Sequence, residues 1–388
     1  MAILEVTAVP FSPRHRGGGE SYPWWLARAL AQREEVITCV SSETPVDVGP
    51  GRVVRIPARF VDLPPFVTAH NPLPTLATAC SIRDLLVQHR PDIEFVHVHN
   101  LRTASSTVWL GVARAQRSRG RFKVLLTDHG ARWFPFPRIT AAAADYYVPV
   151  SDASRVYLES LASRPSFLLP TGVRGDHPGL RQSPRDFDAR DYDLVFFGRI
   201  VPWKRPELLL RLARDLAAGS GRTPRVLIAG SEGRPGFTAW LRREAERLGV
   251  ERSVEFENEP TDERAADLLG RAKLLVLLSS QRDVFGGYHP HPELAGIAVL
   301  EAGACGTPSL VNNLPWAHEQ VRNGRTGVIV PVDAWEQVVR GARSVLDDPA
   351  AWRRMSAEAR RFVAEERTYS VLAAGFSGFL NSIREGRA

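Results

Sequence analysis

The sequence predicts two α/β domains, each built around a parallel sheet with helices on both faces. Two observations indicate this class: short β-rich runs alternate with helical patterns, and the alternation starts again after residue 192. The length of 388 residues is sufficient for two domains of ordinary size, each with its own core. The composition, 44% hydrophobic and 24% charged, is normal for a globular protein.

The first domain is expected to span residues 1–172. Its predicted strands are residues 2–9, 36–41, 53–56, 93–97, 123–127, 146–150 and 167–169. Its predicted helices are residues 22–32, 77–88, 103–118 and 154–162. These runs show either strand-like apolar composition or helical periodicity, and loop residues separate them.

Residues 173–192 are expected to form a linker, because Gly, Pro, Asp and Arg cluster there without apolar periodicity. The second domain then covers residues 193–368. Its predicted strands are residues 194–197, 225–229, 254–256, 274–278, 309–311 and 327–330, with helices between them. A last periodic stretch, residues 371–383, predicts a terminal helix within residues 369–388.

Several classes of protein are not indicated by this sequence. No run of about 18 apolar residues is present, so no transmembrane segment is expected, and the N-terminus reads as a strand and not as a signal peptide. The three scattered cysteines favour a reducing, cytoplasmic setting without a disulfide or metal framework. The net charge of +7 leaves open an acidic acceptor or a peripheral contact with an anionic membrane, whereas nucleic-acid motifs are missing.

Residues 292–308 are the most informative stretch. They begin as a loop, continue as an apolar run of helical character and are broken by Gly306 and Pro308. This pattern predicts Glu293 at the mouth of a helix and Glu301 about two turns inside it. Residues eight apart on a helix lie within about 80° of each other, so both carboxylates are expected to face one polyhydroxylated ligand. The alternative is two solvated glutamates, but the apolar neighbours of Glu301 argue against it.

The second domain also contains a strand that ends at Gly198 and is followed by Arg199 and Lys204 in one loop. Two cations beside the start of a helix suit a diphosphate leaving group, on which negative charge builds as a glycosidic bond breaks. Lys204 is one of only three lysines in a chain rich in arginine, which favours a specific role. The alternative is a solvated basic loop.

The first domain offers three weaker candidates. Gly18 and Gly19 lie between a strand and a helix, where their amides can approach an anion, although a tight turn is the alternative. His97 and His99 share one face of a strand, but no third ligand with suitable spacing accompanies them, so no metal site is predicted. His129 follows a buried strand at the edge where α/β proteins bind ligands, although a structural histidine is the default.

Taken together, these motifs resemble the retaining enzymes of glycosyltransferase family 4, also called group 1. The Glu-x7-Glu segment followed by Ala-Gly-Ala-Cys-Gly-Thr-Pro carries most of the resemblance, and Thr127-Asp128-His129 adds to it. The family has GT-B architecture, which implies two facing Rossmann-like domains with a cleft between them and a last helix that crosses back to the first domain. Asp128 is expected either to orient the imidazole of His129 or to act as a base on the acceptor side.

The resemblance also implies the role of each candidate. Glu293 and His129 would contact the donor sugar, Glu301 the nucleotide ribose, and Arg199 and Lys204 the diphosphate. The other residues implied in donor binding are Gly18, Gly19, Ala295, Gly296 and Ile297. Between Ser280 and Glu293 the chain departs from the family by an insertion, residues 281–292, in which His289 and His291 are expected to replace or supplement the usual sugar contacts.

The function expected from the sequence is metal-independent, retaining transfer of a sugar from a nucleoside-diphosphate sugar, without a cofactor. The acceptor would be a small molecule, a glycan or a lipid-linked molecule. Two alternatives remain at this point: a nucleotide-sugar epimerase or hydrolase of the same fold, and a nucleotide-sugar-binding protein without catalysis. The sequence indicates neither the nucleobase, nor the sugar, nor the oligomeric state.

Overall fold

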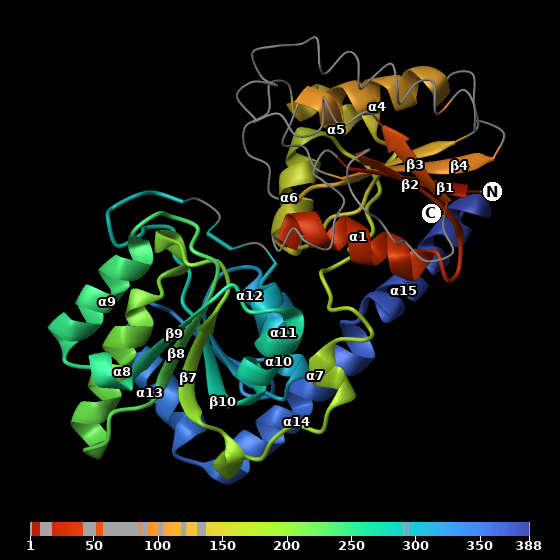
Figure 1. Ribbon diagram of the computed structural model, residues 1–388. Coiled ribbons are helices and arrows are strands. Elements are labelled where there is room, and N and C mark those ends of the chain that lie inside the picture. Colours follow the sequence, from red (N-terminus) through yellow and green to blue (C-terminus); the bar gives the residue numbers. More distant parts are fainter. Residues whose placement is uncertain are drawn as a thin grey trace. The chain divides into compact units, whose positions relative to one another are not determined.

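The structure of the protein is a computed structural model. It describes residues 2–7, 18–41, 52–56, 86, 92–99, 104–117, 122–129, 137–289, 292–293 and 295–387. The chain forms two compact units: the first unit is residues 1–172 with residues 369–388, and the second unit is residues 173–368 (Figure 1). Among the described residues, each unit contains one six-stranded parallel sheet, so the expected class of two parallel-sheet α/β domains is confirmed. Within the described residues, no helix has the length and apolarity needed to cross a membrane.

The sheet of the first unit has the strand order β3-β2-β1-β4-β5-β6, with every pair parallel. Its strands are β1 (Ala2–Thr7), β2 (Glu35–Ser41), β3 (Arg52–Ile56), β4 (Ile93–His99), β5 (Lys123–Thr127) and β6 (Tyr146–Tyr147). Its described helices are α1 (Gly18–Leu30), α4 (Ala104–Arg117), α5 (Pro137–Ala143), α6 (Asp152–Leu161) and α15 (Tyr369–Arg384). This order places β1 and β4 in the centre and so brings their carboxyl ends together.

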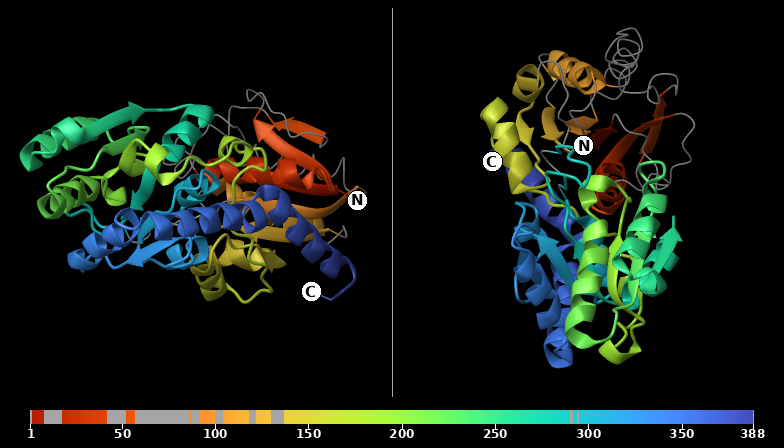
Figure 2. Two further views of the ribbon diagram at one scale, coloured as in Figure 1. Left: turned by 90° about the horizontal axis from the view of Figure 1, so that it is seen from below. Right: turned by 90° about the vertical axis from the view of Figure 1, so that its left-hand side faces the viewer.

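The last helix, α15, completes the core of the first unit. Its apolar face, which includes Phe376 and Leu380, is buried in one cluster with Tyr22 and Leu26 of α1, and the two helices lie side by side (Figures 1 and 2). At the end of α15, Arg384 pairs with the carboxylates of residues 34 and 94. The terminal helix expected from the sequence therefore belongs to the first unit, although the whole second unit, residues 173–368, lies between it and the rest of the first unit in the chain.

The sheet of the second unit repeats the same plan in the order β12-β11-β10-β7-β8-β9. Its strands are β7 (Tyr192–Phe197), β8 (Val226–Gly230), β9 (Val254–Asn258), β10 (Ala272–Leu277), β11 (Ser309–Asn312) and β12 (Gly327–Val330). Its helices are α7 (Pro178–Arg181), α8 (Glu207–Ser220), α9 (Phe237–Leu248), α10 (Asp262–Gly270), α11 (Ile297–Ala304), α12 (Ala317–Gln320), α13 (Trp335–Leu346) and α14 (Pro349–Glu366), with short 3-10 helices η2 (Phe187–Ala189), η3 (Pro202–Lys204) and η4 (Glu251–Ser253). In Figure 1, α8 and α9 lie on one side of this sheet and α10 and α11 on the other.

Two expectations about the elements differ from the structure, and a third lies outside the described residues. Residues 173–192 are not a bare linker, because α7 and η2 form there and the segment belongs to the second unit. Residues 167–169 form no regular strand. The amides of Phe167 and Leu169 donate to carbonyls of residues 147 and 149, but Pro149 and Pro165 have no N–H group with which to continue a ladder. The predicted helix at residues 77–88 lies outside the described residues except for Leu86.

Candidate active site

Two glycines bring the carboxyl ends of β7 and β8 into close contact. Gly198 has a φ of 137° and Gly230 a φ of 141°, and a Cβ on Gly230 would lie 1.9 Å from the carbonyl oxygen of Gly198. No side chain therefore fits at Gly230. Beyond Gly198 the chain enters η3, whose last residue is Lys204. The Nζ of Lys204 returns to within 3.5 Å of the place where a Cβ of Gly198 would stand.

Lys204 meets Glu293, and this ion pair is the centre of the candidate site in the second unit. The Nζ of Lys204 lies 2.8 Å from Oε2 of Glu293, and the two side chains are only 15% and 13% exposed. The other carboxylate oxygen, Oε1, accepts a hydrogen bond from the amide of Gly296 at 3.3 Å. Two residues that the sequence assigned to separate roles are thus in direct contact. An ammonium has three donors, so Lys204 can hold Glu293 and an anionic ligand together.

The helix after Glu293 begins later than the sequence predicts. Helix α11 starts at Ile297, and Gly296 before it is left-handed with a φ of 57°. A Cβ on Gly296 would lie 2.2 Å from the buried ring of Trp316, so only glycine fits there. Glu293 therefore stands on an irregular segment, and Glu301 lies one turn inside α11 instead of two. The prediction that Glu293 lies at the mouth of the helix, with Glu301 about two turns inside it, is therefore wrong in its register.

Glu301 is also less enclosed than its neighbours suggested. Leu300 and Ala302 on either side are fully buried, whereas Glu301 itself is half-buried. Its carboxylate lies near Cys305, whose thiol has a pKa raised to about 12, chiefly by burial and in part by the charge of Glu301. Cys305 is therefore a neutral core residue, and Glu301 keeps access to solvent from α11.

The remaining predicted residues of the second unit lie close to this centre in the chain. Ala295, Gly296 and Ile297 form the entrance to α11, where backbone amides are directed out of the helix start. Arg199 is exposed, and it makes no ion pair with any residue that the structure describes. Its aliphatic stem passes over Gly233, because a Cβ there would lie 2.6 Å from Cγ of Arg199.

The insertion forms an ordered hairpin up to residue 289. Asp283 accepts hydrogen bonds from the amides of Phe285 and Gly287 at 2.8 and 2.9 Å, and its Oδ2 lies 2.8 Å from Nε2 of His289. Burial opposes the charge on Asp283, but these hydrogen bonds lower the pKa of its carboxyl below the ordinary value. His289 also packs on Trp203 in η3, with ring centroids 4.6 Å apart. His289 therefore holds the hairpin, whereas His291 lies outside the described residues.

Arg205 fastens the hairpin to the loop that carries Lys204. Arg205 has a φ of 57°, a left-handed conformation that costs a non-glycine residue about 1 kcal/mol or more. Its guanidinium donates to the hydroxyl of Ser280 at 2.8 Å and to the carbonyl of Arg282 at 2.9 Å, and it also pairs with the buried Glu207. Sequence reasoning missed this residue, because its role depends on backbone conformation.

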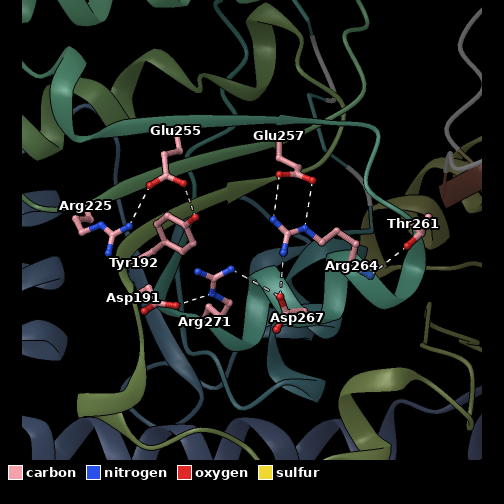
Figure 3. A network of polar contacts seen from close by, with 9 residues as sticks. All are labelled: Asp191, Tyr192, Arg225, Glu255, Glu257, Thr261, Arg264, Asp267 and Arg271. Carbon is pink, nitrogen blue, oxygen red and sulfur yellow. Dashed lines mark hydrogen bonds and ion pairs between the residues drawn. The ribbon is translucent and has the colours of Figure 1, made fainter.

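A second feature of this unit is a pocket of about 260 Å³ at the ends of β8 and β9. Its lining consists of Ile200, Glu232, Thr238, Arg242, Phe256, Glu257 and Asn258. The carboxylate of Glu257 is held by both ends of the Arg264 guanidinium at 3.2 Å, and Thr261 caps α10 by accepting from the amide of Arg264 (Figure 3). The same network continues through Asp267 to Arg271, which stabilises the loop after β9.

The candidate residue of the first unit, His129, ends a buried chain of side chains. His129 is 9% exposed, and its Nε2 lies 3.2 Å from Nδ1 of His99. Nε2 of His99 lies 2.7 Å from Oε2 of Glu5, whose other oxygen lies 3.2 Å from Nδ1 of His97. Parallel pairing of β1, β4 and β5 aligns these residues, since Glu5 stands opposite His97. Glu5, His97 and His99 are each 0% exposed.

The argument against a metal site at His97 and His99 needs a correction. Sequence spacing offered no third ligand for His97 and His99, yet the sheet supplies Glu5, and the three ligand atoms lie within 4.8 Å of one another. The signal was present in the sequence as one carboxylate in the otherwise apolar run of β1. Their contacts are 2.7 to 3.2 Å long, the range of hydrogen bonds.

Gly18 and Gly19 are the first two residues of α1, so their amides belong to a helix start. Residues 8–17, which precede them, lie outside the described residues. Asp128 is buried beside His129, and its carbonyl accepts a hydrogen bond from Ser154 at 3.2 Å. Asp128 and His129 thus follow the carboxyl end of β5, and His129 contacts His99 at the end of β4.

Two family descriptions match the chain. Residues 182–362 match "Glycosyl transferases group 1", and residues 16–177 match "Glycosyltransferase Family 4". The D-inositol 3-phosphate glycosyltransferase of Rhodococcus opacus (strain B4) is 33% identical over 190 residues, which cover 47% of this chain and 40% of that protein. The chain thus aligns with about two fifths of the length of this relative.

Another relative matches over almost the whole length. The GDP-mannose-dependent alpha-(1-6)-phosphatidylinositol monomannoside mannosyltransferase of Mycolicibacterium smegmatis is 26% identical, covering 97% of this chain and 98% of that protein. Among solved structures, sucrose-phosphate synthase from Thermosynechococcus elongatus has a TM-score of 0.74 at 18% identity, with 99% of both chains covered. HepE from Anabaena, in complex with UDP and glucose, has a TM-score of 0.69 at 16% identity, with 98% and 100% covered. These likenesses confirm the GT-B fold.

Proposed function

This chain belongs to the group 1 and family 4 glycosyltransferases, and we propose from that membership that it transfers a sugar from a nucleoside-diphosphate sugar to an acceptor with retention of configuration. The observation that carries the proposal is the Lys204–Glu293 ion pair at the entrance to α11. It joins a cation for phosphate to an acceptor for sugar hydroxyls. The family relatives whose names include GDP-mannose or whose structures contain UDP support a donor of this class.

We assign the diphosphate to Lys204, Arg199 and the amides at the start of α11. The helix start contributes partial positive charge, and a buried ammonium interacts with phosphate more strongly than an exposed one does. Negative charge grows on the diphosphate as the glycosidic bond breaks, so these groups stabilise the transition state more than the bound donor. Together they supply the positive charge that leads us to propose a metal-independent reaction.

Two carboxylates are assigned to hydroxyl groups. Glu293 would accept from hydroxyls of the transferred sugar while Lys204 turns one of its donors to the phosphate, and Glu301 would accept from the ribose. We place the nucleobase in the pocket that Glu257 and Asn258 line. The hairpin of residues 281–289 would form part of the sugar site through Trp203 and Lys204. The first unit would bind the acceptor and supply His129.

The proposal is tested first by binding. Thermal unfolding should be followed with UDP, GDP, ADP and dTDP and with a sugar derivative of each, because a ligand at about 100 times its dissociation constant adds about 2.7 kcal/mol. We expect one nucleobase to raise the melting temperature and its sugar derivative to bind through the same site. If none of the four nucleotides has an effect, the assignment of the second unit is wrong.

Turnover of that donor then separates the functions. Product should form only with an acceptor, for which D-inositol 3-phosphate, free sugars and lipid-linked sugars are the first panel. The anomeric configuration of the product, read by NMR, should match that of the donor. Release of free sugar or isomerised donor at full rate without an acceptor would instead identify a hydrolase or an epimerase.

A further inference from the structure

The buried, hydrogen-bonded side chains of the first unit determine where each of their shared protons lies. The hydroxyl of Thr127 has one hydrogen, which it donates to the carbonyl of Val148 at 2.8 Å. Its oxygen lies 2.8 Å from Nε2 of His97 and must therefore accept a proton from that nitrogen. Nδ1 of His97 faces the carboxylate of Glu5 at 3.2 Å, so one further proton is shared between these two groups.

The same reasoning continues through His99. An oxygen of Glu5 lies 2.7 Å from Nε2 of His99 and accepts from it, so Nε2 of His99 carries a proton. His99 is 0% exposed, and burial disfavours the charged form of an imidazole, so this ring is neutral. A neutral ring with its proton on Nε2 has a lone pair on Nδ1. Among the described residues, Nε2 of His129 faces that lone pair at 3.2 Å and must therefore donate to it.

We propose that Glu5 and His99 are positioning residues, which hold the imidazole of His129 in the tautomer with its proton on Nε2. Tyr22 supports the orientation: its ring packs edge-on against His129 with centroids 4.8 Å apart, and its hydroxyl donates to the carbonyl of Leu169 at 3.0 Å. With Nε2 engaged as a donor, Nδ1 of His129 is an acceptor. The importance of this tautomer for sugar transfer rests on the proposed function, whereas the tautomer itself does not.

The cost of the arrangement supports a role beyond packing. Glu5 is a carboxylate with 0% exposure in the centre of a sheet, where an apolar residue of similar size is often neutral or more stable. His97 and His99 both lie within hydrogen-bonding distance of its carboxylate, and Phe376 of α15 packs on the His97 ring with centroids 5.4 Å apart. The hydrogen-bonded side chains of Glu5, His97 and His99 are therefore covered by α15 at one end and contact His129 at the other.

The test compares two substitutions that both remove the charge. Glu5→Gln keeps one oxygen that can accept from His99, while its amide can donate to a neutral His97. Glu5→Met has a similar shape but no acceptor. Long-range ¹H–¹⁵N spectra of the histidine imidazoles, with His129 assigned through His129→Asn, report the protonated nitrogen of each ring. We expect the proton on Nε2 of His129 in the wild type and in Glu5→Gln, and a mixture of tautomers in Glu5→Met.

Kinetics provide the second readout. With UDP-glucose or GDP-mannose, whichever binds, Glu5→Met should lower kcat by about 10²-fold because the histidine is misaligned, with KM for the donor unchanged. Glu5→Gln should stay near the wild type. A purely structural ion pair would make both variants lose activity in parallel with stability and would overturn the proposal. Thr38→Val, beside Glu5 in the β1 and β2 register, controls for disturbance of the sheet.

Three results would contradict the proposal without any substrate. One is a wild-type spectrum with the proton on Nδ1 of His129. Another is a Glu5→Met spectrum identical to that of the wild type. The third is one equivalent of zinc per chain that is lost in Glu5→Met, because a metal bound to Glu5, His97 and His99 would replace the protons of the chain. If Glu5→Met does not fold, the wild-type spectrum still decides the tautomer. Failure of nucleotide binding would leave this spectrum unaffected and would refute only the proposed function.

Discussion

At the scale of single residues, Lys204 and Glu293 show how a contact can join two predicted roles. The sequence suggested a phosphate-binding cation and a sugar-binding carboxylate, and the structure places them 2.8 Å apart. Each neutralises the other in a setting where an isolated charge would be costly. A ligand that engages one of them must therefore accommodate the other.

Lys204→Ala should lower turnover by about 10²-fold or more, because one charged donor at the leaving diphosphate is lost. Lys273→Ala is the matched control: Lys273 is also 15% exposed and pairs with a carboxylate, that of Asp193, at 3.0 Å, but it stands at the start of β10. Steady-state kinetics and thermal unfolding of both variants separate the effects. Equal turnover in the two variants would remove Lys204 from the diphosphate site.

The two carboxylates are distinguished by a pair of substitutions. Glu301→Gln should weaken the free nucleoside diphosphate and the intact donor equally, by about 1 to 3 kcal/mol, since the ribose is common to both. Glu293→Gln should weaken the intact donor more than the free nucleotide, because only the donor carries the sugar. Isothermal titration calorimetry with both ligands checks this. An unchanged affinity of Glu301→Gln for the nucleotide would contradict its assignment.

At the scale of elements, the hairpin of residues 281–289 is organised from within. Asp283 gathers two amides and His289, and the Phe285 ring packs against Phe237 and Trp240 of α9 with centroids 5.9 and 5.3 Å away. The sequence suggested that the histidines of the insertion touch the sugar. For His289 the contacts with Asp283 and Trp203 favour an indirect effect, through the shape of the hairpin and its attachment to η3.

His289→Ala should therefore change the ratio of kcat/KM between donor sugars that share one nucleotide, while inhibition by the nucleoside diphosphate stays nearly constant. His318→Ala, which removes an exposed histidine bonded to Asn313, is the control. Competition between two such donors in one assay gives the ratio directly. Loss of activity that is equal for all donors would mean that the hairpin does not select the sugar.

At the scale of the whole molecule, much of the fold could be predicted because its strands are continuous apolar runs and its helices are periodic. The structure shows β7, β8 and β10 where the sequence placed strands, shifted by one or two residues. The predictions that failed concern features that depend on contacts between residues far apart in the chain. Helix α11 begins only after the left-handed Gly296, which packs against Trp316 too closely for any side chain, and the local sequence pattern does not indicate this contact.

The candidate site follows the same division. Lys204 and His129 could be proposed as site residues because they follow buried strands, and Glu293 could be proposed because it opens the Glu-x7-Glu segment. Glu5 could not be connected to His99, since 94 residues separate them in the chain and only the pairing of β1 with β4 unites them. The partners of Arg205 were hidden for a related reason, because its left-handed backbone is set by the packing of the hairpin.

The division of the chain into two units also predicts which residues a bound nucleotide protects from hydrogen exchange. The second unit has its own core, and every residue assigned to the nucleotide lies within it except Gly18 and Gly19. Hydrogen exchange with a saturating nucleoside diphosphate should therefore slow mainly in residues 196–205, 256–258 and 293–301, and β2 and α6 should exchange at unchanged rates. Protection confined to the first unit would reverse the assignment of donor and acceptor.

The ion pair between Lys204 and Glu293 affects which of the anions in a cell can bind at this site. An inorganic phosphate ion could attract Lys204, but it has no array of hydroxyls with which to satisfy Glu293, and separating the pair would expose a largely enclosed carboxylate to an anion. A sugar nucleotide brings the anion and the hydroxyls in one molecule. The carboxylate of Glu293 thus competes with other anions for Lys204. Abundant small anions displace it poorly, whereas the proposed donor displaces it well.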